Sequence, residues 1–132
     1  MKTMLKFVCI AFMAFTFAAC SNNTPEKVAV NFAKAFYTGN PEKATEYCTE
    51  ESQKVVALIS GMMESQLEEM QKTHPDIKLV STELASDGNS AKVKLEISNY
   101  IDGKSGEIRK KAHKETVRLK KVDDQWKVAM SK

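Results

Sequence analysis

The spacing of apolar residues changes at His74-Pro75-Asp76, and this change restricts the fold more than any other feature of the sequence. Before it, apolar residues recur every three or four positions, which is typical of helices. After it, they recur at every second position, which is typical of strands. The sequence therefore predicts three helices followed by a long, curved antiparallel sheet.

The three predicted helices begin at recognisable capping residues. Thr24-Pro25 and Asn40-Pro41 each place an N-cap residue before a proline, which is tolerated at the first helical position because its missing N–H has no partner there. Gly39 is expected to end the first helix, and the second is short. Thr49 is expected to cap a third helix over about residues 50–72, with one broad apolar face. That face carries Val55, Val56, Ile59, Met62, Met63, Leu67 and Met70.

The first two predicted strands form a hairpin. They cover Ile77 to Ala85 and the alternating segment Ala91 to Ile97, with Asp87-Gly88-Asn89 as the turn. The second segment has the pattern of a strand with one buried and one wet face.

A long strand is predicted from Glu107 to Val122, after a loop at residues 102–106. Its apolar residues change parity, so we expect a bulge or strong bend between Ala112 and Val117. Asp123-Asp124 then turns the chain into a final strand, whose inward residues are Trp126, Val128 and Met130.

The first 19 residues have the three parts of an export signal. Lys2 and Lys6 are positive, residues 7–17 are almost entirely apolar, and Ala18-Ala19 precede Cys20. The apolar run is shorter than the roughly 20 residues that a membrane-spanning helix needs. The Ala-Ala-Cys stretch resembles the lipobox of bacterial lipoproteins, although Phe17 replaces the usual aliphatic residue. The resemblance implies acylation of Cys20; the alternative is an ordinary signal peptide that leaves Cys20 as a plain thiol.

Cysteine content and charge limit the classes of function. Cys48 is the single thiol that remains once Cys9 is removed and Cys20 is acylated, so no internal disulfide is expected. It lacks a nucleophile elbow or a neighbouring histidine, which favours a buried apolar role over a catalytic one. Removal of Lys2 and Lys6 lowers the formal charge of +3 to +1, with acids and bases intermixed. We therefore expect no nucleic-acid partner, and no residue spacing indicates a metal or cofactor.

The run from Phe32 to Ala44, together with a bent sheet ending in Gln125-Trp126-Lys127-Val128, resembles the nuclear transport factor two superfamily. It is more narrowly similar to small bacterial lipoproteins with a lumazine-binding-like, cystatin-like domain of uncharacterised function. The resemblance implies a cone-shaped α+β fold, with three N-terminal helices on the concave face of a curved four-stranded antiparallel sheet, often around a cavity. The expected organisation is a signal at residues 1–19, a lipidated cysteine and tether at 20–23, and this domain at 24–132.

The ketosteroid-isomerase-like branch of this superfamily has a catalytic pattern that the chain lacks. In that branch, a tyrosine seven residues before the end of the first helix donates a hydrogen bond, and here Phe32 stands at that position. The base of that branch would fall in the apolar run from Val55 to Ile59. Glu50 and Glu51 lie nearby, but the dipole at a helix start accounts for them. No catalytic residue is therefore predicted from the resemblance.

The long strand supplies the main pocket candidates. If Val117 and Leu119 face inward, alternation brings His113 and Glu115 to the same face, where they could act as an acid/base pair or orient a polar ligand. The alternative is a solvated surface, because basic residues surround them: Arg109, Lys110, Lys111, Lys114 and Arg118. The other candidate pocket residues are Tyr37, Tyr47, Tyr100, Met62 and Trp126, each of which also suits a core boundary.

Two functions follow from these observations. The first is a lipid-anchored periplasmic module, held to the outer membrane through Cys20, that binds a small apolar or amphipathic ligand or a protein without catalysis. The second is a cavity enzyme that uses His113 and Glu115 in a reaction of unknown type. A homodimer through the outer sheet face is compatible with the superfamily, although Lys92 and Lys94 make that face poorly suited to an apolar interface.

Overall fold

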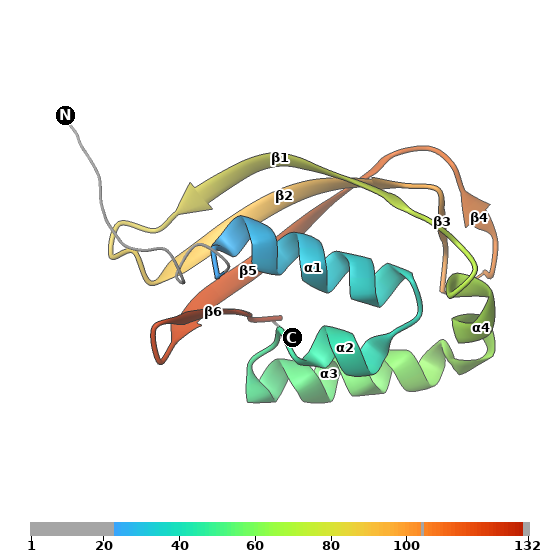
Figure 1. The fold of residues 1–132 in the computed structure, drawn as a ribbon, viewed down its shortest axis with the longest axis horizontal. Coiled ribbons are helices and arrows are strands. Elements are labelled where there is room, and N and C mark those ends of the chain that lie inside the picture. The colour runs from blue at the N-terminus through green and yellow to red at the C-terminus, as the bar shows by residue number, and fades with distance from the viewer. Residues whose placement is uncertain (1–22, 104, 131–132) are drawn as a thin grey trace.

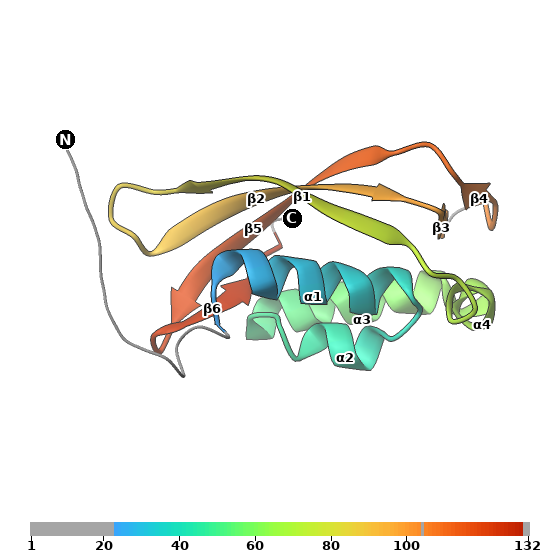
Figure 2. The same ribbon diagram turned by 45° about the horizontal axis from the view of Figure 1, so that its top comes forward.

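The computed structural model describes residues 23–103 and 105–130. Figure 1 shows helices against a twisted sheet, and the turned view in Figure 2 shows that they lie on one side of it. Within these residues all helices precede all strands, so the predicted α+β class is confirmed. The predicted signal peptide and Cys20 lie outside the described residues.

The three predicted helix starts are confirmed. Helix α1 (Pro25–Tyr37) begins after Thr24, whose Oγ1 accepts a hydrogen bond from Lys27 N at 3.2 Å. Helix α2 (Pro41–Thr45) follows Asn40. Helix α3 (Glu50–Met62) begins after Thr49. The hydroxyls of Thr24 and Thr49 each accept from a backbone N–H in the first turn of their own helix, whereas the Asn40 side chain makes no such bond.

The third helix ends at Met62, so the prediction that it continues to residue 72 is wrong. A 3-10 helix η2 (Glu64–Gln66) and a short helix α4 (Leu67–Met70) follow it. The break lets the chain turn back, so that Met70 becomes buried and Gln71 Nε2 donates to Gly39 O at 3.2 Å. Packing against the junction of α1 and α2 therefore overrides local helix propensity here.

The main sheet has four antiparallel strands in the order β1-β2-β5-β6. Their bounds are β1 (Asp76–Leu84), β2 (Ser90–Ser98), β5 (His113–Val122) and β6 (Gln125–Val128). Asp123 and Asp124 have φ values of 52° and 64°, as a two-residue type I′ hairpin turn requires. The predicted hairpin turns are confirmed, and a register shift at Val80 in β1 is an additional irregularity.

The bend in the predicted long strand lies earlier than expected. Strands β3 (Tyr100–Ile101) and β4 (Ile108–Arg109) form a separate two-stranded sheet, called here the β3–β4 hairpin. Residues 110–112 leave this hairpin, and β5 then pairs with β2 without a register shift. The prediction of one strand from residue 107 to 122, bulged between Ala112 and Val117, is therefore wrong. The change of apolar parity reflects a switch between two sheets.

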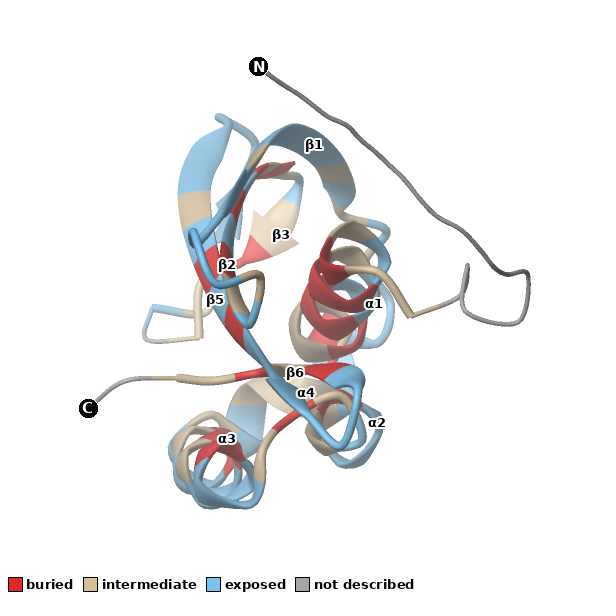
Figure 3. Ribbon diagram, turned by 90° about the vertical axis from the view of Figure 1, so that its left-hand side faces the viewer, coloured by how far each residue is buried: buried red, intermediate tan, exposed pale blue. Residues whose placement is uncertain are grey.

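The core lies between α1 and the inner face of the sheet, and its buried segments are red in Figure 3. Every second residue of β2 points into it, and Ala91, Val93, Leu95 and Ile97 are at most 4% exposed. Phe32 of α1 packs in the same cluster. Each large apolar side chain buried here contributes about 1.5–3 kcal/mol.

The connection between α2 and α3 covers the outer edge of β6. Val128 N donates to Tyr47 O at 2.7 Å, and Thr49 N donates to Val128 O at 3.0 Å. Cys48 between them is 2% exposed, which confirms its predicted burial, and burial raises the pKa of Cys48 to about 12. The main cluster of buried apolar residues lies within residues 28–128, so we expect residues 21–132 to fold without the signal.

Candidate functional site

A pocket of about 1110 Å³ lies where α1, α3 and α4 approach the β3–β4 hairpin. Helix α1 contributes Phe36 and Tyr37 to its wall. Further apolar side chains come from the other elements: Ile59, Met63, Met70, Ile101 and Ile108. A concave, mainly apolar site of this size is typical of small-molecule binding.

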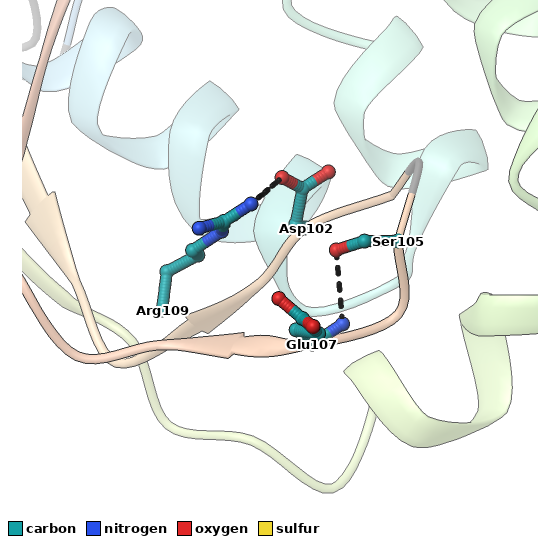
Figure 4. Close-up of polar contacts among 4 residues, drawn as sticks. All are labelled: Asp102, Ser105, Glu107 and Arg109. Carbon is teal, nitrogen blue, oxygen red and sulfur yellow. Dashed lines mark hydrogen bonds and ion pairs between the residues drawn. The ribbon is translucent and has the colours of Figure 1, made fainter.

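The β3–β4 hairpin is held against the end of α3 by close backbone approach. A Cβ atom at Gly103 would overlap the outer part of the Met63 side chain, so a larger residue here would require Met63 to move. Figure 4 shows the contacts within the hairpin: Arg109 Nη2 lies 3.1 Å from Asp102 Oδ2, and Glu107 N donates to Ser105 Oγ at 3.2 Å. These contacts give the pocket a wall with a defined shape.

Tyr37, Tyr100 and His113 line one side of the larger pocket, and they form a polar cluster with Glu115, which lines a neighbouring smaller pocket. Tyr37 Oη donates to Glu115 Oε2 at 3.3 Å, and His113 Nε2 lies 3.2 Å from the same oxygen. The Tyr37 and Tyr100 rings meet edge to face at 5.2 Å, and Tyr100 lies 6.3 Å from the His113 ring. The cluster joins the end of α1 to two strands that are distant in sequence.

The sheet register accounts for the placement of the two titratable residues. Glu115 pairs with Leu95 and His113 with Ile97, and both partners are fully buried on the inner face. The predicted alternation is therefore confirmed, and both side chains start from the face that carries the core. Both residues precede the buried part of β5, so the side chain of Glu115 is 41% exposed and that of His113 is 52% exposed.

Burial, and then the charge and hydrogen bond of Glu115, raise the pKa of Tyr37 well above its usual range. The phenol therefore stays protonated at neutral pH and acts as a donor. Its proton is directed at Glu115, so the two residues orient each other. This arrangement can bind a polar group beside the apolar wall.

A smaller pocket of about 350 Å³ lies on the other side of the Tyr37–Glu115 contact. Both pockets are lined by Phe36, Tyr37 and Ile59, so the hydrogen-bonded pair stands between two neighbouring spaces. The inner wall of the second pocket is apolar, with Val117 and Val128.

The remaining predicted site residues divide between two regions. Met62 lines the larger pocket and is 74% exposed. Tyr47 and Trp126 do not line either of these two pockets. Tyr47 packs beside β6, and Trp126 is buried beneath Lys121, whose Nζ lies 5.4 Å from the ring. Tyr47, between α2 and α3, and Trp126 of β6 thus serve the core, as their alternative interpretation proposed.

Sequence reasoning did not assign Phe36, Ile59 or the basic residues 109–111 to the pocket. Arg109, Lys110 and Lys111 are exposed, as the predicted solvated surface requires, and they also line the larger pocket. They are called the basic rim below. The signal that could have found them is the run of cations directly before a candidate acid/base pair.

The described part of the chain lacks two other kinds of feature. Within residues 23–103 and 105–130, no three His, Cys, Asp or Glu side chains are grouped to hold a metal ion. In the same residues, no helix has the length and apolar character that crossing a bilayer requires.

The fold is that of the NTF2-like class. A crystal structure of a candidate NTF2-like transpeptidase from Campylobacter jejuni matches with a TM-score of 0.55 and 19% identity, over 82% of this chain and 99% of that one. The intermembrane space region of the chloroplast protein ARC6 matches with a TM-score of 0.50 and 11% identity, over 89% of this chain and 95% of that one. At these identities the likeness shows the fold alone.

The sequence matches the family described as Domain of unknown function DUF4878 over residues 18–129. The chain therefore belongs to the DUF4878 family. No curated protein matches it.

Proposed function

We propose that this protein is a lipid-anchored domain of the cell envelope that binds a small amphipathic molecule without transforming it. The observation that carries the proposal is the pocket of about 1110 Å³, which combines an apolar wall with the polar groups of Tyr37, Tyr100 and His113. Such a combination lets the apolar part of a ligand leave water while a few polar groups fix its orientation. Acylation of Cys20 would hold the domain at the membrane, in the periplasm.

The chemistry of the described side chains supports binding over catalysis. The Cys48 thiol is buried and its pKa is raised to about 12, so it is a poor nucleophile. The Tyr37 proton is already donated to Glu115. The imidazole of His113 and the carboxylate of Glu115 are about half exposed to water, which weakens their electrostatic action on a substrate.

Native mass spectrometry tests the binding function. Residues 21–132 would be exported to the periplasm, purified without detergent, and weighed under native and denaturing conditions. We expect an additional mass on each chain that disappears on denaturation. Ala112 lines the pocket, so Ala112→Trp should abolish the additional mass, whereas the exposed Ala57 of α3 lies outside both pockets and Ala57→Trp should retain it. Equal retention by both variants would contradict binding in this pocket.

Metabolic labelling with a clickable fatty acid tests the anchor in the full chain. We expect Cys20→Ser to abolish the label and Cys48→Ser to retain it, because Cys48 is enclosed in the domain. Labelling that survives Cys20→Ser would contradict anchoring through this residue.

A cavity enzyme is the second candidate, and the 3.2 Å contact between His113 Nε2 and Glu115 Oε2 favours it. A carboxylate that orients an imidazole can support proton transfer. The variant His113→Ala separates the two functions. If His113 were catalytic, the wild type would transform its ligand and the variant would carry a ligand of different mass. The same ligand mass on both proteins, with unchanged far-UV circular dichroism, would contradict catalysis by this pair.

A further inference from the structure

We propose that the ligand is an amphiphile with an anionic head, held by the basic rim while its apolar chain lies along the pocket wall. This inference rests on the binding function proposed above and adds the chemical class of the ligand. The shared chemistry of that class is a carboxylate or phosphate joined to an alkyl chain.

The basic rim has two cations that are available to a ligand. Arg109 is engaged with Asp102, as Figure 4 shows, with Nη2 and Oδ2 3.1 Å apart. Lys110 and Lys111 are exposed and line the pocket, and no ion pair or hydrogen bond engages either ammonium in the described part of the chain. An anion at this position would therefore meet two free positive charges.

The carboxylates beside the pocket already have partners. Asp102 contacts Arg109, and Glu115 Oε2 accepts from Tyr37 and lies 3.2 Å from His113 Nε2. A cationic head would find these acids engaged and would be repelled by the two lysines. The charge arrangement therefore favours an anion over a cation of equal size.

The apolar surface continues from the pocket wall to the basic rim. Met63 and Met70 line the wall, and methionine side chains adapt to irregular apolar ligands. Met62 and Ile108, which are 74% and 60% exposed, also line the pocket. Exposed apolar side chains gathered at a hollow mark a binding surface. An alkyl chain could bury these residues while its head remains at the lysines.

Isothermal titration calorimetry of residues 21–132 with four dodecyl probes tests the class. The probes are dodecanoate, dodecyl phosphate, dodecanol and dodecyltrimethylammonium, each kept below its micelle concentration. We expect each anion to bind at least about tenfold more tightly than the alcohol or the cation, because a charge-assisted contact is gained. The tighter anion would indicate whether a carboxylate or a lipid phosphate is the natural head.

Lysine variants locate the head. The double variant Lys110→Gln, Lys111→Gln should weaken binding of both anions about tenfold and leave dodecanol unchanged. The control, Lys78→Gln with Lys94→Gln, makes the same charge change on the outer sheet face and should leave all affinities unchanged. Far-UV circular dichroism confirms that each variant is folded.

The results separate this inference from the function on which it rests. If dodecanol binds as tightly as the anions, or the Lys110 and Lys111 variant keeps wild-type anion affinity, the anionic class is overturned and ligand binding stands. If none of the four probes binds and native mass spectrometry shows no additional mass, the proposed function itself is overturned; an additional mass without probe binding overturns only the anionic class. Salt provides an independent measurement on the wild type, because exposed charges are screened and anion affinity should fall as sodium chloride is added. Anion affinity independent of salt would also overturn the class.

Discussion

Ser52 and Ser60 occupy the same face of α3, two turns apart, yet their hydroxyl groups have opposite environments. Ser52 is 1% exposed, and its Oγ accepts from Met130 N at 2.7 Å and from Thr49 Oγ1 at 2.8 Å. Ser60 is 8% exposed, and its Oγ has no hydrogen-bond partner among the described residues. Substitution by alanine should therefore destabilise the domain at Ser52 but not at Ser60.

The size of each expected change in stability follows from the polar groups that the substitution removes or leaves without a partner. Ser52→Ala leaves the Met130 N–H without its acceptor and frees the Thr49 hydroxyl, so we expect the free energy of unfolding to fall by about 1–3 kcal/mol. Ser60→Ala removes a buried hydroxyl that gains no compensating bond. We expect that change to be neutral or to stabilise the domain by up to about 1 kcal/mol.

Urea unfolding of residues 21–132 measures both effects. Trp126 is the single tryptophan of the chain and is buried, so its fluorescence reports the transition. The urea concentration at the midpoint should fall for Ser52→Ala and should stay the same or rise for Ser60→Ala. The slope of the free energy of unfolding against urea concentration should be unchanged in both variants. Ser65→Ala, at an exposed position, is the control and should shift stability by less than about 0.5 kcal/mol. Equal losses at Ser52 and Ser60 would refute the assignment of their hydrogen bonds.

Two further predictions concern a glycine and the buried cysteine. Gly39→Ala should lower the free energy of unfolding by more than about 2 kcal/mol, because φ is +76° and a Cβ would lie 2.5 Å from Leu67 O. Gly88 has a similar φ of +73° but lies in open space, so Gly88→Ala should lower the free energy of unfolding by only about 1 kcal/mol. Similar losses for both would exclude the steric contact. Because the pKa of Cys48 is raised, the folded domain keeps this thiol protonated at pH values where the unfolded chain loses the proton. The contribution of Cys48 to stability is therefore complete below pH 9. It is lost as pH rises from 9 towards 12, at up to about 1.4 kcal/mol per pH unit. Alkaline unfolding curves for wild type and Cys48→Ala should therefore converge, and a constant difference would contradict the shift.

The local features of the fold could be predicted because their causes are local. The capping residues Thr24 and Thr49 act on the first turn of their own helices, and Asp123-Asp124 forms a turn within four residues. Strict alternation along a strand likewise predicts that His113 and Glu115 share the inner face, and this prediction needs no knowledge of their contacts.

The features that the sequence did not predict depend on distant parts of the chain. Helix α3 ends at Met62, directly after Gly61, and the following residues return to pack on Gly39. One glycine weakens a helix without ending it, so Gly61 alone did not predict this end. The switch from β4 to β5 depends on which strand each one pairs with, which the parity of apolar residues alone does not reveal. Similar local patterns can thus end in different tertiary positions.

The candidate site shows the same division. The sequence by itself determined the capped helices, the alternating strands and the shared face of His113 and Glu115. Only the tertiary structure brought Tyr37 to Glu115, across 78 positions, turned Lys110 and Lys111 towards a pocket, and left Trp126 in the core. The physical reason is that backbone preferences act over a few residues, whereas a pocket forms where separate elements pack and leave a space between them.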